Sequence, residues 1–265
     1  MENDCSRHLI CPSLYLDKSG ATNYYMTQIF PLSEGTFTIG HDKVFHPFNE
    51  NTDELNDRPT GSLLVEVQPF ALVNNTDIIL LDTGLGFNTP DGTAHLPGNL
   101  AKHNIHPEDV TKILMSHLHK DHAGGLDVDL FPNATIYIYQ PEMEFALQTG
   151  FPSYYTDDLL PLMRSDKVQW LQAEEGLIDG YIHYQLSGGH APHHIVFTIE
   201  TEDGKVFFGG DEAPQYKQMK MKYLAKYDYD GKKAMQLRQE WALRGAEEGW
   251  KFLFYHDIKK PVAVL

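Results

Sequence analysis

The densest group of metal-binding side chains is the string HLHKDH, which begins at His117. It follows the apolar run 113–115, which we expect to be a short buried strand. His117 and His119 are two positions apart, so in an extended turn their side chains point to the same side. Imidazoles and carboxylates bind zinc and related transition metals. The string predicts a metal centre in which Asp121 and His122 face a second cation.

Further candidate ligands follow three later segments of the chain. His190 and Asp211 are each preceded by two glycines, which allow close backbone approach. His256 comes directly after the apolar run 252–255. Loops at strand ends collect functional residues in layered folds. The complete set of predicted metal ligands is His117, His119, Asp121, His122, His190, Asp211 and His256.

Apolar runs predict two groups of strands, each with helices attached. We expect strands at residues 63–67, 70–73, 78–81, 113–115, 135–139, 181–186, 195–199, 206–208 and 252–255. We expect helices at residues 141–148, 157–164 and 232–248. The polar, proline-bounded segment 45–59 is expected to be a long loop. Two packed sheets flanked by helices fit this order.

Composition excludes several classes of partner and location. The formal net charge of −16 repels phosphate backbones, so we expect no nucleic-acid partner. No apolar run reaches the ~18 residues that a membrane span needs, and the first residues lack a signal-peptide pattern. A cytoplasmic location follows by default. Cys5 and Cys11 are expected to be free thiols in a reducing compartment, with a local bridge as the alternative.

The ordered motifs resemble the metallo-β-lactamase superfamily of hydrolases. They are LLDTG at 80–84, HLHKDHAGG at 117–125, GGHAPHH at 188–194, FGGD at 208–211 and YHD at 255–257. The resemblance implies an α+β fold, a four-layer αββα sandwich, formed by residues 1–265 as a single domain. It places the site at the edge between the two sheets. The layout is most similar to acyl-homoserine-lactone lactonases, because no cysteine stands among the ligands of the second metal.

The resemblance also implies how the ligands divide. The first metal would be held by three histidines, His117, His119 and His190. The second would be held by Asp121, His122 and His256. Asp211 would bridge the two metals, and Asp82 is similar to the aspartate that supports the histidine loop. Two divalent ions are therefore expected. Zinc is the first choice, and iron, manganese or cobalt also suits such ligands.

The expected chemistry is hydrolysis by a hydroxide that bridges two cations ~3.5 Å apart. Asp121 is expected to orient the hydroxide and later to carry a proton. The lactonases carry a tyrosine three residues after the bridging aspartate, where it helps to hold the substrate carbonyl. That position is Pro214 here, so Tyr216 is the candidate substitute. The predicted catalytic residues are Asp121 and Tyr216.

The substrate class stays open among several alternatives. The first is a small-molecule ester or lactone, with quorum quenching as the implied role. The second is a phosphoester or organophosphate, which the same two-metal chemistry allows. A thiolester hydrolase of the glyoxalase II kind and a thiol dioxygenase are further alternatives. A di-iron oxidoreductase is another alternative, but His119 speaks against it, because such proteins typically carry glutamate at this position. A non-catalytic metal-binding protein is the last alternative. The sequence does not predict the oligomeric state.

Overall fold

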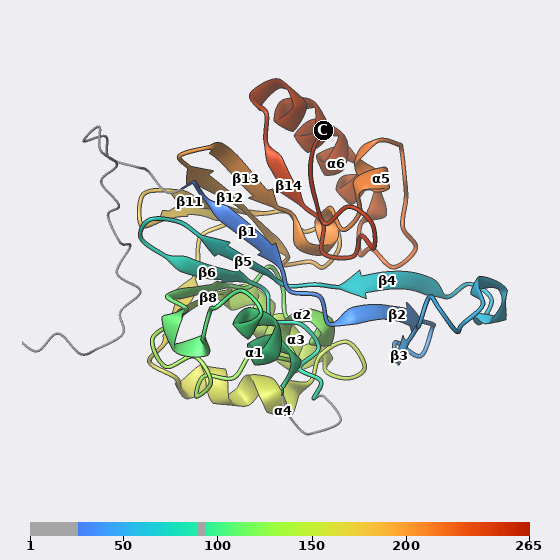
Figure 1. The fold of residues 1–265 in the computed structure, drawn as a ribbon, viewed down its shortest axis with the longest axis horizontal. Coiled ribbons are helices and arrows are strands. Elements are labelled where there is room, and N and C mark those ends of the chain that lie inside the picture. The colour runs from blue at the N-terminus through green and yellow to red at the C-terminus, as the bar shows by residue number, and fades with distance from the viewer. Residues whose placement is uncertain (1–25, 89–93) are drawn as a thin grey trace, which may run out of the picture.

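Two six-stranded sheets form the centre of the structure, a computed structural model that describes residues 26–88 and 94–265 (Figure 1). In spatial order, the first sheet contains β1 (Gln28–Pro31), β5 (Phe70–Val73), β6 (Ile78–Leu81), β7 (Lys112–Leu114), β8 (Thr135–Tyr139) and β9 (Val168–Leu171). The second contains β10 (Glu175–Ile178), β11 (Ile182–Leu186), β12 (Ile195–Thr201), β13 (Gly204–Phe208), β14 (Lys251–Leu253) and β15 (Val262–Val264). Cys5 and Cys11 lie outside the described residues.

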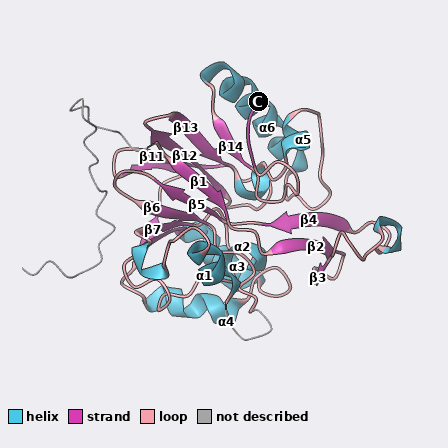
Figure 2. Ribbon diagram, in the orientation of Figure 1, coloured by secondary structure: helices cyan, strands magenta, loops and turns pink. Residues whose placement is uncertain are grey.

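Helices lie outside both sheets and complete four layers (Figure 2). On the side of the first sheet are α1 (His95–Ala101), α2 (Lys120–Ala123), α3 (Gln140–Thr149) and α4 (Thr156–Leu159). On the side of the second sheet are α5 (Tyr216–Met219) and α6 (Gly231–Glu248). Single 3-10 turns occur at η1 (Leu55–Asp57), η2 (Pro107–Asp109), η3 (Leu160–Arg164) and η4 (Gly210–Glu212). The predicted α+β class and αββα sandwich are confirmed.

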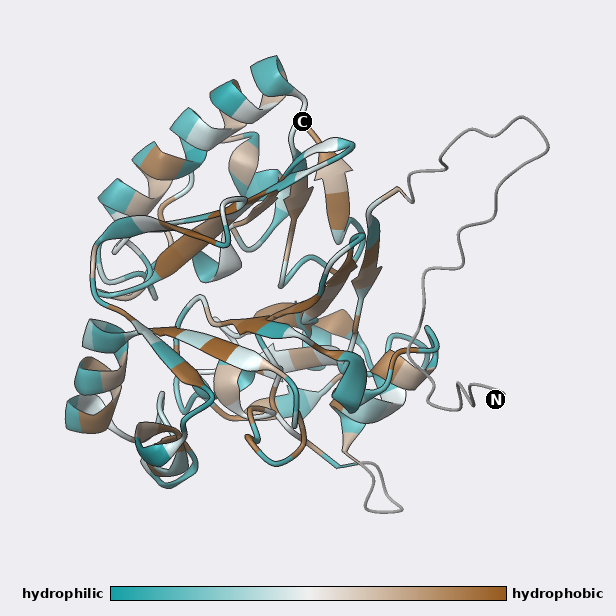
Figure 3. Cartoon of the chain, turned by 90° about the vertical axis from the view of Figure 1, so that its left-hand side faces the viewer, coloured by the Kyte–Doolittle hydropathy of each residue, from teal (hydrophilic) through white to brown (hydrophobic). Residues whose placement is uncertain are grey.

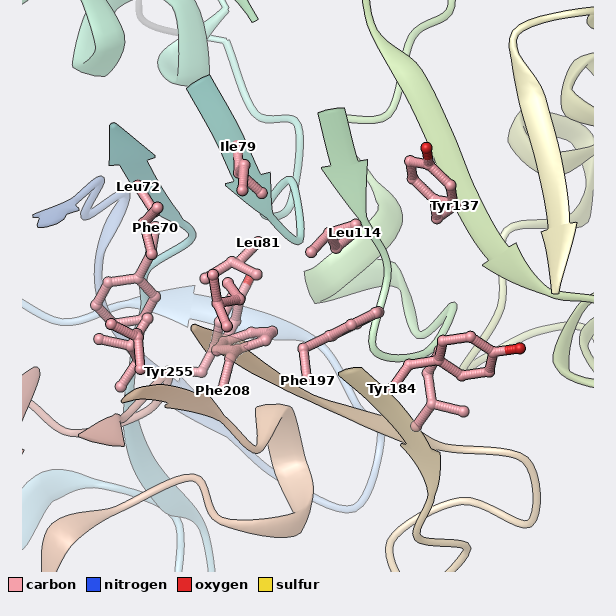
Figure 4. Close-up of a cluster of buried hydrophobic side chains, with 14 of the residues drawn as sticks. Phe70, Leu72, Ile79, Leu81, Leu114, Tyr137, Tyr184, Phe197, Phe208 and Tyr255 are labelled. Carbon is pink, nitrogen blue, oxygen red and sulfur yellow. The ribbon is translucent and has the colours of Figure 1, made fainter. Parts of the chain in front are cut away.

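Successive side chains of the central strands point alternately into two buried cores, which explains the continuous apolar runs. In β6, Ile79 and Leu81 belong to the core between the sheets, together with Phe208 of β13 (Figure 4). Leu80 belongs to a separate core beneath the helices. Successive side chains of a strand point to opposite faces, so a strand covered on both sides is apolar throughout. Figure 3 shows hydrophobic residues along the strands and hydrophilic ones on the outer helices.

Parallel pairing brings the predicted ligands to one edge. β6, β7, β8 and β9 pair in parallel, and so do β13 and β14. The carboxyl ends of parallel strands meet at the same edge of a sheet, and function collects there. Asp82 follows β6, and His117 follows β7 after two residues. Asp211 follows β13 and His256 follows β14, each also after two residues.

The expected loop at 45–59 is wrong for its first three residues. They form β3 (Phe45–Pro47), which pairs with β2 (Gly35–Ile39). β4 (Leu63–Val67) pairs with the other side of β2, and this three-stranded sheet extends away from the main sheets in Figure 1. Phe45 packs on Phe37, with ring centroids 6.0 Å apart, and this contact stabilises β3. Local sequence patterns do not indicate contacts between residues this far apart in the chain.

Within residues 26–88 and 94–265, no helix has the length and hydrophobicity that a membrane span requires. The cytoplasmic location and the single domain over residues 1–265 stay predictions.

Candidate metal centre

All seven predicted ligands converge at the edge between the two sheets. They form two groups, and within each group the candidate ligand atoms all lie within 4.8 Å of one another. The first group consists of His117, His119 and His190. The second consists of Asp121, His122, Asp211 and His256. Every member except the half-buried His119 is buried, so the structure brings together the whole predicted set in a protected place.

The Asp211 carboxylate lies between the two groups. Its Oδ1 atom is 3.1 Å from His122 Nε2 and 2.9 Å from His256 Nε2. Its Oδ2 atom is 3.3 Å from His190 Nε2. One carboxylate therefore faces both groups with different oxygens, as a bridging ligand requires.

Three ring nitrogens converge in the first group. His119 Nδ1 lies 2.9 Å from His117 Nε2 and 3.2 Å from His190 Nε2. Three imidazole nitrogens this close can bind one cation together, as in a three-histidine zinc site.

Asp82 orients two of the histidines from behind. Its Oδ2 atom lies 2.7 Å from His122 Nδ1 and accepts a hydrogen bond from Ser116 Oγ at 2.7 Å. Ser116 Oγ lies 3.1 Å from His117 Nδ1. A proton held on each Nδ1 leaves the Nε2 lone pair free for a metal. The structure thus places Asp82 where the family resemblance predicts its supporting role.

The end of β14 completes the second group. His256 Nδ1 donates to the Glu66 carbonyl at 2.6 Å, which turns Nε2 toward the centre. The Tyr255 hydroxyl donates to the Asp121 carbonyl at 2.6 Å. The Tyr255 ring also stacks on His122, with centroids 4.0 Å apart. Two consecutive residues that follow β14 therefore fix three members of the group.

The unpaired atoms of the second group fit a divalent cation. His122 Nε2 and Asp211 Oδ1 are fully buried and have no hydrogen-bond partner among the described residues. Buried polar atoms without partners cost about 1–3 kcal/mol each. A cation bound between them would satisfy both, and a set of nitrogen and carboxylate donors suits zinc. The residues present thus fit a pair of divalent cations.

Electrostatics favour positive charge at this point. Burial alone would raise the pKa of Asp211, but His256, His122 and His190 hold that pKa well below its usual range. Burial lowers the pKa of His122, but the Asp211 and Asp121 carboxylates outweigh it and raise the pKa well above 6.5. Burial and the neighbouring imidazoles lower the pKa of His117 well below 6.5. The carboxylates therefore favour positive charge beside His122, while His117 stays neutral, the form in which imidazole binds metals.

A close backbone contact fixes the loop that carries HLHKDH. An added Cβ atom at Gly124 would lie 2.2 Å from the Leu85 carbonyl oxygen. The contact is reciprocal, because a Cβ atom at Gly86 would lie 2.1 Å from the Gly124 carbonyl oxygen. Thr83 N–H donates to the His122 carbonyl at 2.7 Å in the same region. The glycines allow the loops after β6 and β7 to join beside the ligands.

Tyr216 packs outside the two groups. Its ring lies edge-on to Phe254 at 5.9 Å, and Lys260 Nζ lies 4.2 Å from the ring centroid. Among the described residues, none of its recorded aromatic, cation or hydrogen-bond contacts is with a predicted ligand. A second tyrosine is closer to the centre: the Tyr227 ring lies 5.9 Å from the His190 ring. Tyr227 was not predicted, because no local sequence pattern distinguishes it.

The sequence model of the metallo-beta-lactamase superfamily matches residues 64–250. The chain belongs to the metallo-beta-lactamase superfamily. The matched span contains six of the seven predicted ligands, and His256 follows it. Both the predicted family and the predicted fold are confirmed.

Curated relatives of this superfamily member match part of the chain. An N-acyl homoserine lactonase from Bacillus thuringiensis is 32% identical over 96 residues, which are 36% of this chain and 35% of that protein. The corresponding lactonase from Bacillus cereus is 33% identical over 96 residues. The chain thus matches about a third of the length of these relatives.

Solved structures match nearly the whole length of this superfamily member. A probable metal-dependent hydrolase from Staphylococcus aureus has a TM-score of 0.71 at 22% identity, covering 89% of this chain and 91% of its own. AidC, a dizinc quorum-quenching lactonase, has a TM-score of 0.69 at 20% identity, covering 91% of each chain. The hydrolase AbOPH has a TM-score of 0.67 at 22% identity, covering 91% and 92%. At these identities the likenesses show the fold.

Proposed function

We propose that this chain is a dinuclear metal-dependent hydrolase that opens a lactone or cleaves another small carboxylic ester. The observation that carries the proposal is the Asp211 carboxylate, which faces three histidines of both ligand groups within 3.3 Å. The matched lactonase segments and the AidC fold likeness support the choice of a lactone. Zinc is the proposed metal.

The cations would supply an activated water and polarise the substrate carbonyl when bound. Asp121 is proposed to orient the attacking water and then to carry its proton to the leaving alkoxide oxygen. Its Oδ2 atom lies 3.5 Å from His256 Nε2 and 3.7 Å from His122 Nε2, so the carboxylate stands at the second ligand group. The bond from Tyr255 to its carbonyl holds the Asp121 backbone in place.

Two tyrosines are candidates for holding the substrate carbonyl. Tyr216 follows Asp211 closely in the sequence, but its ring packs on Phe254. The Tyr227 side chain contacts His190 and keeps 40% of its surface exposed, so solvent and substrate reach it. Its hydroxyl accepts a hydrogen bond from Gln218 Nε2 at 3.3 Å. We therefore propose Tyr227 ahead of Tyr216 for this role.

A substrate panel on zinc-loaded protein tests the proposal. We expect turnover of N-acyl homoserine lactones and aryl esters, and loss of that turnover in Asp211→Asn at unchanged fold. Protein that holds two zinc ions yet opens no lactone and cleaves no aryl ester would contradict it. Faster turnover of a phosphotriester than of any ester would favour the organophosphate alternative, and turnover of a thiolester alone would favour the glyoxalase II-like one.

A further inference from the structure

His190 is held at every polar atom except one. Its backbone N–H donates to Glu212 Oε2 at 3.0 Å, and its carbonyl accepts from Tyr229 N–H at 3.0 Å. Its ring Nδ1 lies 3.2 Å from Asp228 Oδ1. Only Nε2 remains, and it faces Asp211. The segment between α5 and α6 thus closes over the back of His190.

Arg238 of α6 balances the charge behind His190. The Asp228 side chain is 0% exposed and the Arg238 side chain 1% exposed, and Arg238 Nη2 lies 3.8 Å from Asp228 Oδ2. Arg238 Nη1 donates to the Glu212 carbonyl at 2.8 Å, and Nη2 donates to the Tyr223 carbonyl at 2.9 Å. A buried carboxylate without a counter-charge is strongly unfavourable. One guanidinium therefore ties the segment over His190 to the loop that carries Asp211.

The same device supports the second ligand group. His122 is backed by the fully buried Asp82, just as His190 is backed by the fully buried Asp228. Each group therefore contains one imidazole whose rear nitrogen meets a carboxylate. Such a carboxylate fixes the ring tautomer and makes the facing nitrogen a better ligand.

We propose that Asp228 and Arg238 are positioning residues that hold His190 as the Nδ1–H tautomer and so set the metal affinity of the first ligand group. The inference rests on the proposed dinuclear centre. Asp228 keeps the His190 Nε2 lone pair directed at His119 and Asp211. Arg238 holds Asp228 in place.

Zinc titration of Asp228→Asn tests the inference without measuring turnover. We expect zinc affinity to fall about 10–100-fold at one of the two sites and to stay at the wild-type value at the other. Asp77→Asn is the matched control, because Asp77 is also a buried carboxylate with a cationic partner, Lys112. Asp77 precedes β6, whereas Asp82 and the candidate ligands lie at the other end of that strand. This control should lose stability and keep both zinc ions.

The result that would overturn the inference is wild-type binding at both sites in Asp228→Asn, or equal weakening at both sites. Arg238→Lys, which keeps the charge, should bind zinc more tightly at the affected site than Arg238→Met. If Asp228→Asn does not fold, NMR of the folded wild type decides. A proton on His190 Nδ1 is expected, and an Nδ1 without a proton would overturn the inference.

The zinc counts separate this inference from the proposed function. Wild-type protein with two zinc ions and no ester turnover would contradict only the function. If Asp228→Asn binds zinc with wild-type affinity at both sites, or with equally weakened affinity at both, and the wild type turns over esters, only the positioning role is contradicted.

Discussion

His122 Nδ1 and Asp82 Oδ2 lie 2.7 Å apart, and neither side chain has any exposed surface. Asp82 reaches this position with a left-handed backbone, φ 56°, at the end of β6. A non-glycine residue adopts this conformation at a cost of about 1–3 kcal/mol. The hydrogen bonds of Asp82 with Ser116 and His122 offset that cost. Asp82 thereby joins the end of β6 to the segment that carries the HLHKDH string.

Asp82→Ala should therefore affect both stability and metal binding. It removes the acceptor for Ser116 N–H, Ser116 Oγ–H and His122 Nδ1. We expect the free energy of unfolding to fall by about 3–5 kcal/mol, because buried partners are left unpaired. Zinc affinity at the second ligand group should fall by about 10–100-fold. Urea unfolding and zinc titration measure the two effects. Asp129→Ala, an exposed aspartate, is the control, and equal behaviour of the two variants would contradict this account.

Gly124→Ala tests the close contact between the loops after β6 and β7. The new Cβ atom would meet the Leu85 carbonyl oxygen at 2.2 Å, so one loop must move. Overpacking of this kind costs about 1–3 kcal/mol. Gly98→Ala in α1 has nothing within 4 Å of its added Cβ atom and should instead stabilise the protein by about 0.5–1 kcal/mol. Thermal unfolding compares the two variants, and a neutral Gly124→Ala would show that this contact does not constrain the ligand loop.

Tyr227→Phe and Tyr216→Phe distinguish the two candidate tyrosines. Loss of a hydroxyl that stabilises the substrate carbonyl lowers kcat by about 100-fold. We expect that loss for Tyr227→Phe, because its ring contacts His190. Tyr216→Phe should change kcat/KM by no more than about 2-fold, as a substitution away from the site does. Lactone hydrolysis by both proteins at equal zinc content makes the comparison. The reverse order would restore Tyr216 as the catalytic tyrosine.

The ion pair of Asp77 and Lys112 predicts the pH dependence of stability far from the metal centre. Burial opposes ionisation of Asp77, but hydrogen bonds from Lys112, Tyr181 and Thr111 lower its pKa below 3.8. A carboxyl group with a lowered folded-state pKa stabilises the fold above its unfolded pKa, and the stabilisation disappears as the pH falls through the folded value.

Asp77→Asn should therefore cost about 1–3 kcal/mol near neutral pH, where it leaves buried donors without their charged acceptor. Its deficit relative to the wild type should shrink as the pH falls below 3.8, since the wild-type carboxyl group then protonates. Urea unfolding of both proteins across this range gives the measurement. A deficit that stays constant to low pH would rule out the charged form as its source.

Local patterns predicted, for identifiable reasons, the residues that converge at the candidate metal centre. The string from His117 to His122 is dense, and a buried strand precedes it. Asp82, Asp211 and His256 also follow apolar strands, where a polar residue is conspicuous. Parallel pairing then carries these strand ends to one edge, which is a property of the whole fold.

Other features had no local signal. Asp228 lies 38 positions after His190 (228 − 190), in a segment without regular structure. Arg238 lies on the buried face of α6 with Ala234 and Trp241, but arginine is rarely fully buried, so its residue type predicts an exposed side chain. The half-exposed strand β9 and the predominantly exposed β10 lack a clear alternation and were not predicted. These features depend on contacts between distant segments.

The most direct test of the central claim is anomalous diffraction from zinc-loaded crystals at the zinc absorption edge. The account predicts two peaks ~3.5 Å apart. One should lie among His117, His119 and His190, the other among Asp121, His122 and His256, with the Asp211 carboxylate between them. A single peak at saturating zinc, no peak, or His190 and His256 turned away from the peaks would contradict it.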